Sequence, residues 1–314
     1  MKGIFYVFKK NGGFSLIKNY FYNHVFLYAI TLLLFLPKNR TGLELFREAI
    51  NLKVYNHIYE KYKKYLSLID KNNNEDISIP KTIWFCWFQG LAQAPELVKV
   101  CFESIKRNCK DYNIVLVDRN NFNEYTDIPE IILKKWNKGI ITNTHFSDIL
   151  RSALLLKNGG IWIDATVFLT GDIPVEILNS KLFLFQTYKP GSDGKAYNLS
   201  SWFIASTSES VVFKQVMLLL TKYWEKNNYL CDYFLFHIFV QIVLNAYPEI
   251  TNSIPKYTNE TPHYLLFELG KKFDKTRFDY LVKKTFCHKL TYKLDESQKS
   301  DKSNYYNWIL ENFR

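Results

Sequence analysis

The chain has 314 residues and a mass of 37.3 kDa, and its 47% hydrophobic and 23% charged residues exclude wholesale disorder. The low contents of Gly (12) and Pro (9) exclude collagen-like and low-complexity chains. Lys and Arg number 41 against 30 Asp and Glu, and the formal net charge of +11 attracts anionic lipid, phosphorylated substrates or nucleic acid without choosing among them. The five cysteines include no CxxC pair, which disfavours a zinc site and is typical of a reducing compartment.

An apolar stretch near the N-terminus raises the question of a membrane contact. Positions 25–36 read VFLYAITLLLFL, and the wider segment 20–37 is interrupted by Asn23 and His24. A spanning helix needs about 20 apolar residues, so this segment is too short to cross a bilayer. Basic residues lie on both sides, including Lys18 and Lys38, and favour a helix in the headgroup region of an anionic membrane. A buried core helix is the alternative.

Helical periodicity continues over residues 41–70, and the polar stretch 70–76 that follows is the predicted linker. We therefore expect a helical N-terminal region of residues 1–75 and a second domain of residues 76–314. Beyond the linker, strands are expected at 81–88, 112–117, 161–169, 182–186 and 202–205. Helices are expected from Pro95 onward and at 128–137, 144–157, 209–226 and 232–246. This alternation predicts an α/β sheet with helices on both faces.

Ligands of such sheets bind beyond the carboxyl ends of the strands. Three segments follow predicted strands there, namely Gln89-Gly90, Asp118-Arg119 and Asp164-Ala165-Thr166. The sequence thus predicts that they lie near one crevice.

A group of charged residues around the third predicted strand is the best candidate for chemistry. Asp148 and Arg151 are three residues apart on a predicted helix and so face the same way. Gly159-Gly160 permits a tight turn into the strand that carries Asp164. A carboxylate in such an apolar strand needs a partner, which could be a metal, a hydroxyl or Arg151. A purely structural ion-pair network of these three residues is the alternative to a functional site.

The order of these residues resembles the S-D-x-x-R … G-G-x-x-x-D-x-D region of DxD-type glycosyltransferases, from Ser147-Asp148 through Arg151 and Gly159-Gly160 to Asp164. Positions 79–87, IPKTIWFCW, resemble the first strand of those enzymes, where the nucleotide base docks. The most similar family is the capsular polysaccharide synthesis family, which is related to yeast-type α-mannosyltransferases and, more distantly, to clostridial glucosylating toxins. The resemblance is clearest over 79–175, weaker to about residue 250, and slight in 1–70 and 255–314.

This resemblance implies a GT-A-like, Rossmann-type nucleotide-sugar-binding domain with an added helical N-terminal region. It implies that Asp148 and Arg151 hold the donor sugar and that Asp164 is the first Asp of the DxD motif, with Mn or Mg as cofactor. The second Asp is replaced by Thr166, so the implied metal ligands are Asp164 and Thr166. A neutral hydroxyl is a poorer ligand for either ion than a carboxylate, and Asp172 is a possible substitute.

Other candidates each have a structural alternative. Trp84 and Trp87 would stack on the donor base, or else are strand residues of the core. Asp232 would be a catalytic carboxylate, or else the N-cap of the following helix. We expect His237 to pack in the core and positions 198–202, NLSSW, to form a loop beside the acceptor, and we find no role for His145.

The function that this resemblance implies is transfer of a sugar from a nucleotide-sugar donor to a lipid-linked oligosaccharide, with retention of configuration, in bacterial capsular or surface polysaccharide synthesis. The protein would be cytoplasmic and peripheral on the anionic inner face of the plasma membrane. No nucleic-acid-binding motif is found, and we expect no nucleic-acid partner. A non-catalytic sugar-nucleotide-binding or scaffold protein of the same fold is the alternative.

Overall fold

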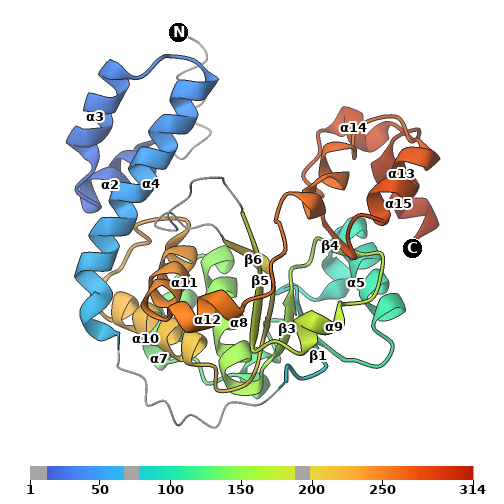
Figure 1. Cartoon of the computed structure of the whole chain (residues 1–314), viewed down its shortest axis with the longest axis horizontal. Coiled ribbons are helices and arrows are strands. Elements are labelled where there is room, and N and C mark those ends of the chain that lie inside the picture. Colours follow the sequence, from blue (N-terminus) through green and yellow to red (C-terminus); the bar gives the residue numbers. More distant parts are fainter. Residues whose placement is uncertain (1–12, 67–77, 188–198, 314) are drawn as a thin grey trace.

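The computed structural model describes residues 13–66, 78–187 and 199–313 (Figure 1). The predicted linker at 70–76 lies outside these ranges, and so does Asn198. The division into residues 1–75 and 76–314 therefore stays a prediction.

A central five-stranded sheet has the order β2-β1-β3-β6-β5. Its strands are β1 (Thr82–Cys86), β2 (Asn113–Val117), β3 (Gly160–Ile163), β5 (Leu182–Gln186) and β6 (Leu199–Ser206). Strand β1 pairs in parallel with β2 and β3, whereas β6 is antiparallel to both β3 and β5. All five lie where the sequence predicted strands, but β6 takes in positions 199–202, which we expected to form a loop.

Helices cover both faces of this sheet, as predicted for an α/β fold (Figure 1). Trp84 and Trp162 point to the face that packs against α8 (Asn143–Asn158), α10 (Val211–Lys226) and α11 (Leu235–Ala246). Ile83, Phe85 and Ile163 point to the other face, which packs against α5 (Glu96–Asn108). Successive side chains of a strand alternate between faces, so a strand buried on both sides is apolar throughout.

The sequence predicted one strand at 161–169, and this is wrong because the structure has two strands there. Strand β3 ends at Ile163, and β4 (Val167–Leu169) pairs antiparallel with β7 (Cys287–Lys289) in a separate two-stranded sheet. Between them the Val167 N–H donates to the Asp164 carbonyl at 2.9 Å, which closes a turn. Asp164 thus lies at the carboxyl end of β3 and not inside a strand.

The N-terminal helical lobe consists of α2 (Phe14–Tyr22), α3 (Phe26–Phe35) and α4 (Arg40–Tyr62). The buried face of α4, with Val54 and Ile58, belongs to the same core as α10 and α11. Asn245 Nδ2 also donates to the Tyr55 hydroxyl at 2.8 Å. The predicted helical N-terminal region is therefore present. It packs against α10 and α11, the helices that cover one face of the central sheet.

Helix α3 leaves most of its apolar side chains in solvent. Leu27, Leu34 and Phe35 are 78%, 76% and 82% exposed, and Ala29 is the buried residue of this helix. The alternative of a buried core helix is thus wrong for this segment. Within the part of the chain that the structure describes, no helix has both the length and the apolar character needed to cross a membrane.

The remaining chain completes the helical layers and builds a C-terminal helical region opposite the N-terminal lobe (Figure 1). The other helices are α6 (Phe122–Tyr125), α7 (Glu130–Asn137), α9 (Val175–Leu178), α12 (Pro248–Ser253), α13 (Lys275–Val282), α14 (Glu296–Ser300) and α15 (Tyr305–Asn312), with short 3-10 helices at Lys63–Tyr65, Leu91–Gln93, Thr261–His263 and Leu265–Phe267. A small core beneath α13 and α15 includes Phe168 of β4 and one side of α5.

The turn from α8 into β3 requires glycine at two successive positions, as the sequence predicted. Gly159 and Gly160 have φ angles of 64° and 96°. A Cβ on Gly160 would lie 2.5 Å from the carbonyl oxygen of Thr82 on the neighbouring strand. This close approach lets α8 and β3 present Asp148, Arg151 and Asp164 to the same space.

We expect Gly160→Ala to lower the free energy of unfolding by roughly 2–4 kcal/mol, because it combines backbone strain with a steric clash. Urea denaturation measures this loss. Gly139→Ala is the matched control, since Gly139 also has a positive φ of 71° but no atom near the added methyl group. The control should lose only about 1 kcal/mol. Equal losses for both variants would show that the contact with Thr82 is unimportant.

Candidate functional site

A cleft of about 450 Å³ lies at the carboxyl ends of β1 and β3. Its walls include Trp87 and Gln89 after β1, and the turn Asp164-Ala165-Thr166 after β3. Its charged lining residues are Asp148, Arg151, Asp164 and Lys289. The predicted crevice is therefore present, with the Gln89 and Asp164–Thr166 segments on it.

Arg151 joins the two carboxylates that the sequence singled out. Its Nη2 atom lies 3.3 Å from Asp148 Oδ1 and 3.4 Å from Asp164 Oδ1. The guanidinium also donates to the Ser201 carbonyl at 2.5 Å and packs over the ring of Trp162, with 4.9 Å to the ring centre. The ion-pair network that we kept as an alternative exists, and it forms part of the cleft wall.

Asp164 has partners on both carboxylate oxygens. Oδ1 accepts the indole N–H of Trp162 at 2.8 Å, and Oδ2 accepts from Lys289 Nζ at 2.9 Å. Burial by itself raises the pKa of Asp164, but the charges of Lys289 and Arg151 and the hydrogen bonds from Trp162 and Lys289 lower it to about 2. Asp164 is therefore a carboxylate at any physiological pH.

Lys289, which the sequence analysis missed, is the second cation of the site. Its ammonium donates to Asp164 and also to the Thr166 hydroxyl at 2.8 Å. It reaches the cleft because β7 pairs with β4, where Lys289 lies opposite Val167. No local sequence pattern marks this lysine, because Asp164, its ion-pair partner, lies 125 positions earlier in the chain.

Asp148 has a neighbour on α8 at each of its two carboxylate oxygens. Arg151 pairs with one oxygen, and the Nδ1 atom of His145 lies 3.6 Å from the other. The side chain of Asp148 is 10% exposed, toward the cleft that it lines. His145 itself accepts the indole N–H of Trp224 at 3.1 Å. The i, i+3 spacing of His145 and Asp148 was the signal that could have pointed to this contact.

The two tryptophans near β1 have different places. Trp84 is 3% exposed, donates its indole N–H to the Gly159 carbonyl at 2.8 Å and is not among the residues that line the cleft, so it lies in the core. Trp87 lies on the cleft wall, where its ring meets that of Tyr292 edge to face. Of the two residues predicted to stack on the base, Trp87 lines the cleft and Trp84 does not, and the stacking role stays a prediction.

Asp232 is not among the residues that line the cleft. Its carboxylate accepts the Phe234 N–H at 2.7 Å, in a turn just before α11, which begins at Leu235. Burial raises its pKa to about 6, while that hydrogen bond lowers it by less. No contact of Asp232 in the described structure supports the predicted catalytic role, which stays a prediction.

Two other polar segments also lie away from the cleft. Asp118 accepts the backbone N–H groups of the turn that follows it, and Arg119 packs over the ring of Trp136. Asp172 is not among the residues that line the cleft, and its charge adds to burial in raising the pKa values of Cys109 and Tyr112. His237 packs against the rings of Phe234 and Phe236, as expected, and also borders the cleft.

The side chains at Asp164 and Thr166 do not fit a Mn or Mg site. Both ions favour several oxygen ligands with carboxylates among them. In the described residues, no group of three or more His, Cys, Asp or Glu side chains is arranged to hold a metal ion. The position between the Asp164 carboxylate and the Thr166 hydroxyl is taken by the Lys289 ammonium.

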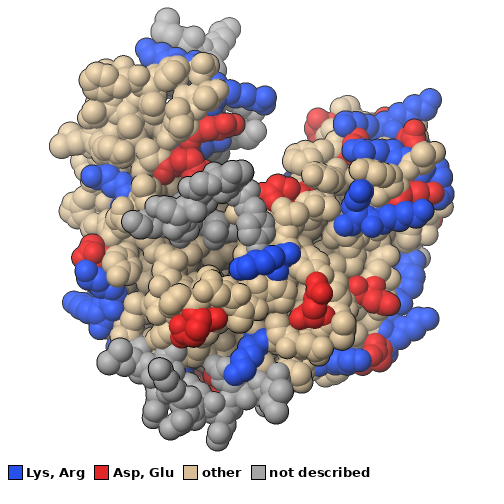
Figure 2. Space-filling model, viewed as in Figure 1, with Lys and Arg blue, Asp and Glu red and all other residues tan. Residues whose placement is uncertain are grey.

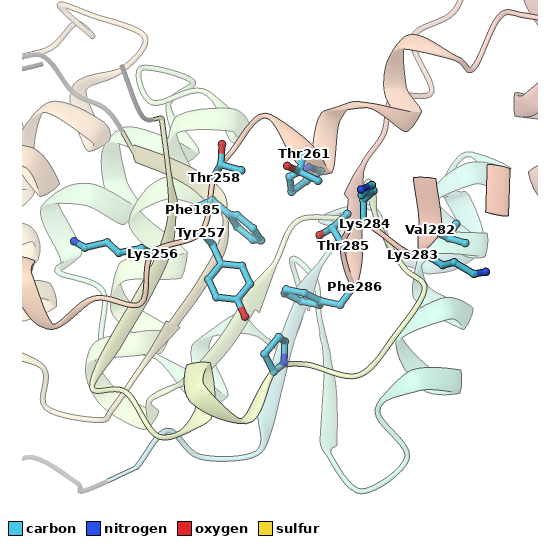
Figure 3. Close-up of a pocket in the computed structure, with 12 residues that line it drawn as sticks. Phe185, Lys256, Tyr257, Thr258, Thr261, Val282, Lys283, Lys284, Thr285 and Phe286 are labelled. Atoms are coloured by element: carbon cyan, nitrogen blue, oxygen red, sulfur yellow. The ribbon is translucent and has the colours of Figure 1, made fainter. Parts of the chain in front are cut away.

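A second cleft, also of about 450 Å³, lies next to β5 (Figure 3). Figure 3 shows the rings of Phe185, Tyr257 and Phe286 gathered along it, while Lys256 and Lys283 extend away from these rings. Its described lining residues include no carboxylate. The first cleft, which has two carboxylates and two cations, is therefore the candidate site.

The chain matches the capsular polysaccharide synthesis protein family over residues 39–309, and it belongs to this family. The match starts within the N-terminal lobe and reaches α15, so it covers more of both ends than the sequence motifs indicated. The mixed α/β sheet and the helical N-terminal region agree with the predicted GT-A-like fold class.

Individual relatives share less of the chain. It is 30% identical over 102 residues to the O-glycosyltransferase braB of Annulohypoxylon truncatum, a match that spans 30% of this chain and only 24% of that protein. Among solved structures, PaToxG glycosyltransferase has a TM-score of 0.37 and 15% identity, over 85% of this chain and 97% of that one. The glycosyltransferase GlyE of Streptococcus pneumoniae, in its apo form, has a TM-score of 0.35 and 12% identity, over 74% and 62% of the two chains.

We expect Asp164→Asn to lower the free energy of unfolding at about pH 7, with a deficit that shrinks as the pH falls. The pKa of Asp164 is lowered from 3.8 to about 2 on folding. A depressed carboxyl pKa adds stability that is present above the unfolded value and lost as the pH falls through the folded value. Urea denaturation of wild type and variant at about pH 7, 4 and 3 measures the difference.

Asp232→Asn is the control, because the pKa of Asp232 is shifted in the opposite direction from that of Asp164. The pKa of Asp232 is raised to about 6 on folding, so its charge opposes folding above that pH. This variant should be as stable as wild type, or more stable, at about pH 7, and the difference should vanish below about pH 4. A pH-independent deficit for Asp164→Asn would mean that the shape of the side chain matters and its charge does not.

Proposed function

We propose that this protein is a glycosyltransferase that moves a sugar from a nucleotide-sugar donor to a carbohydrate acceptor. The observation that carries the proposal is the network of Asp148, Arg151 and Asp164 on the wall of a cleft, in a member of the capsular polysaccharide synthesis family. The names of the relatives, which are glycosyltransferases, support it.

The cleft offers a separate group for each part of such a donor. Asp148 presents carboxylate oxygens that can accept hydrogen bonds from sugar hydroxyls and so orient the anomeric carbon. Trp87 offers an aromatic surface for the base. Arg151 and Lys289 balance the charges of Asp148 and Asp164, so the cleft does not repel a diphosphate. These placements support binding of a nucleotide sugar.

We further propose that transfer proceeds with retention of configuration by a front-face displacement. A double displacement needs a carboxylate that is free to attack the anomeric carbon. Both carboxylates of the cleft are instead engaged, Asp148 with Arg151 and Asp164 with Arg151, Lys289 and Trp162. The proposal includes no Mn or Mg, because the side chains at the DxD position do not fit either ion.

The proposed acceptor is a lipid-linked oligosaccharide of bacterial surface polysaccharide synthesis, reached at the inner face of the plasma membrane. The exposed apolar side chains of α3 support this idea, since an uncovered apolar surface marks a contact site. In Figure 2 the outer side of the N-terminal helical lobe is largely uncharged, with basic side chains at its tip. An apolar surface bordered by basic groups suits binding in the headgroup region.

A second candidate is a non-catalytic sugar-nucleotide-binding or scaffold protein of the same family, favoured by the loss of the second Asp to Thr166. A screen of UDP- and GDP-sugars with purified protein separates the two. The enzyme releases nucleoside diphosphate by slow donor hydrolysis, whereas a scaffold binds the donor and leaves it intact. Binding without hydrolysis or transfer across the panel would favour the scaffold.

We expect Asp148→Asn to slow donor hydrolysis by about 100-fold, as for other single polar contacts made in the transition state. Binding of the free nucleoside diphosphate should change little, because Asp148 is assigned to the sugar. Calorimetry and a diphosphate-release assay give the two readouts. The control is Asp127→Asn, which removes an exposed carboxylate paired with Lys157. If nucleotide binding and hydrolysis fall together, Asp148 is not a sugar-specific contact.

We expect Leu34→Glu combined with Phe35→Glu to reduce sedimentation with phosphatidylglycerol vesicles by about tenfold or more, since both side chains then lose their apolar burial in the membrane. High salt should weaken wild-type binding without abolishing it, and alkaline carbonate should release the protein. The control pair, Val175→Glu with Phe267→Glu, alters side chains that are 69% and 67% exposed elsewhere. Equal losses for both pairs, or no loss for either, would contradict a membrane role for α3.

A further inference from the structure

Lys289 occupies the position where the resemblance to DxD enzymes places a metal ion. Its Nζ atom lies 2.9 Å from Asp164 Oδ2 and 2.8 Å from Thr166 Oγ1, so it contacts both residues of the altered motif. These are the two side chains from which a metal ligand set would start. A cation is therefore already built into this part of the cleft.

The backbone holds this lysine in place. Strand β7 pairs with β4 so that Lys289 is opposite Val167, the residue after Thr166. The Leu290 N–H also donates to the Thr166 carbonyl at 2.8 Å. The lysine and the turn that carries Asp164 thus form one hydrogen-bonded unit, which limits the entropy lost when the ammonium meets a ligand.

The Lys289 side chain is partly exposed on the cleft wall. The Lys289 side chain is 21% exposed and lines the same cleft as Asp148 and Arg151. An ammonium has three hydrogens to donate, and the bonds to Asp164 and Thr166 use two of them. The third can reach an anionic oxygen in the cleft.

We propose that Lys289 takes the place of a divalent cation and binds the diphosphate of the donor. This inference rests on the proposed function. In the reaction, the bond between the anomeric carbon and the diphosphate oxygen breaks, and its electron pair stays on that oxygen. The acceptor hydroxyl oxygen bonds to the anomeric carbon, and its proton passes to the departing diphosphate. Lys289 stabilises the negative charge that grows on the leaving oxygen.

Nucleotide binding without metal is the direct test. Calorimetry of UDP, GDP and dTDP with the full chain, in EDTA and separately with Mn, does not depend on turnover. We expect at least one nucleotide to bind equally well in both conditions. Lys289→Ala should weaken that binding by about tenfold to 100-fold, the worth of a charge-assisted hydrogen bond. Lys289→Arg, which keeps the charge, should retain more of the affinity than Lys289→Ala.

Two further variants keep the test decisive. Lys293→Ala removes an exposed lysine four positions away, outside the cleft, and should leave binding unchanged. Thr166→Asp combined with Lys289→Ala restores the second carboxylate and removes the ammonium, so it should gain Mn binding in an electron paramagnetic resonance titration with the metal alone. Thermal melting of each variant shows whether it is folded.

The possible outcomes separate this inference from the proposed function. Nucleotide binding that requires Mn, and that folded Lys289→Ala retains, would overturn the role of Lys289 and leave the glycosyltransferase proposal intact. Mn binding by wild type equal to that of the double variant would also overturn it. Absence of binding for every nucleotide in both conditions would overturn both proposals.

Discussion

The carboxylate of Asp164 is the constraint on which the rest of the site depends. It lies at the end of β3 in an environment where an unpaired charge is costly. Its cationic partners come from two other elements, Arg151 from α8 just before β3 and Lys289 from β7, 125 positions later in the chain. These two ion pairs therefore connect α8 and β7 with the end of β3 in the central sheet, at the carboxylate of Asp164. The cleft is formed where these segments meet.

The features that could be predicted from the sequence are those that local backbone geometry determines. The i, i+3 spacing of Asp148 and Arg151 fixes a shared helix face, and the successive glycines 159 and 160 fix the turn into β3. The split of the expected strand at 161–169 was missed because β3 and β4 are both buried and together read as one apolar run. The polar residue in that run was the sign of its end. Asp164 marks the point where β3 stops and the chain leaves for another sheet.

Other features depended on tertiary contacts that composition and spacing do not encode. Trp84 and Trp87 come from the same aromatic stretch, but the indole N–H of Trp84 finds an acceptor inside the core at Gly159. Trp87 follows the strand and so reaches the cleft. Lys289 is one of 41 basic residues, and only the pairing of β4 with β7 distinguishes it from the others. Such long-range pairings are what a single sequence leaves open.

The site departs from the DxD pattern in two ways, with Thr166 in place of the second aspartate and with the Lys289 ammonium beside Asp164. Each of these departures explains the other. An aspartate in place of Thr166 would put two carboxylates beside Lys289 and Arg151, with Asp148 as a third negative charge. The cleft would then carry an excess of negative charge that repels a diphosphate, and a divalent ion would be needed to reverse it. With Thr166, the hydroxyl still accepts a hydrogen bond from Lys289 but adds no charge. The two cations then balance the two carboxylates, Asp148 and Asp164, and the lysine keeps a donor for the ligand. Under the proposed role of Lys289, loss of the second aspartate is compatible with transfer, because the neutral threonine leaves Lys289 as the cation beside Asp164.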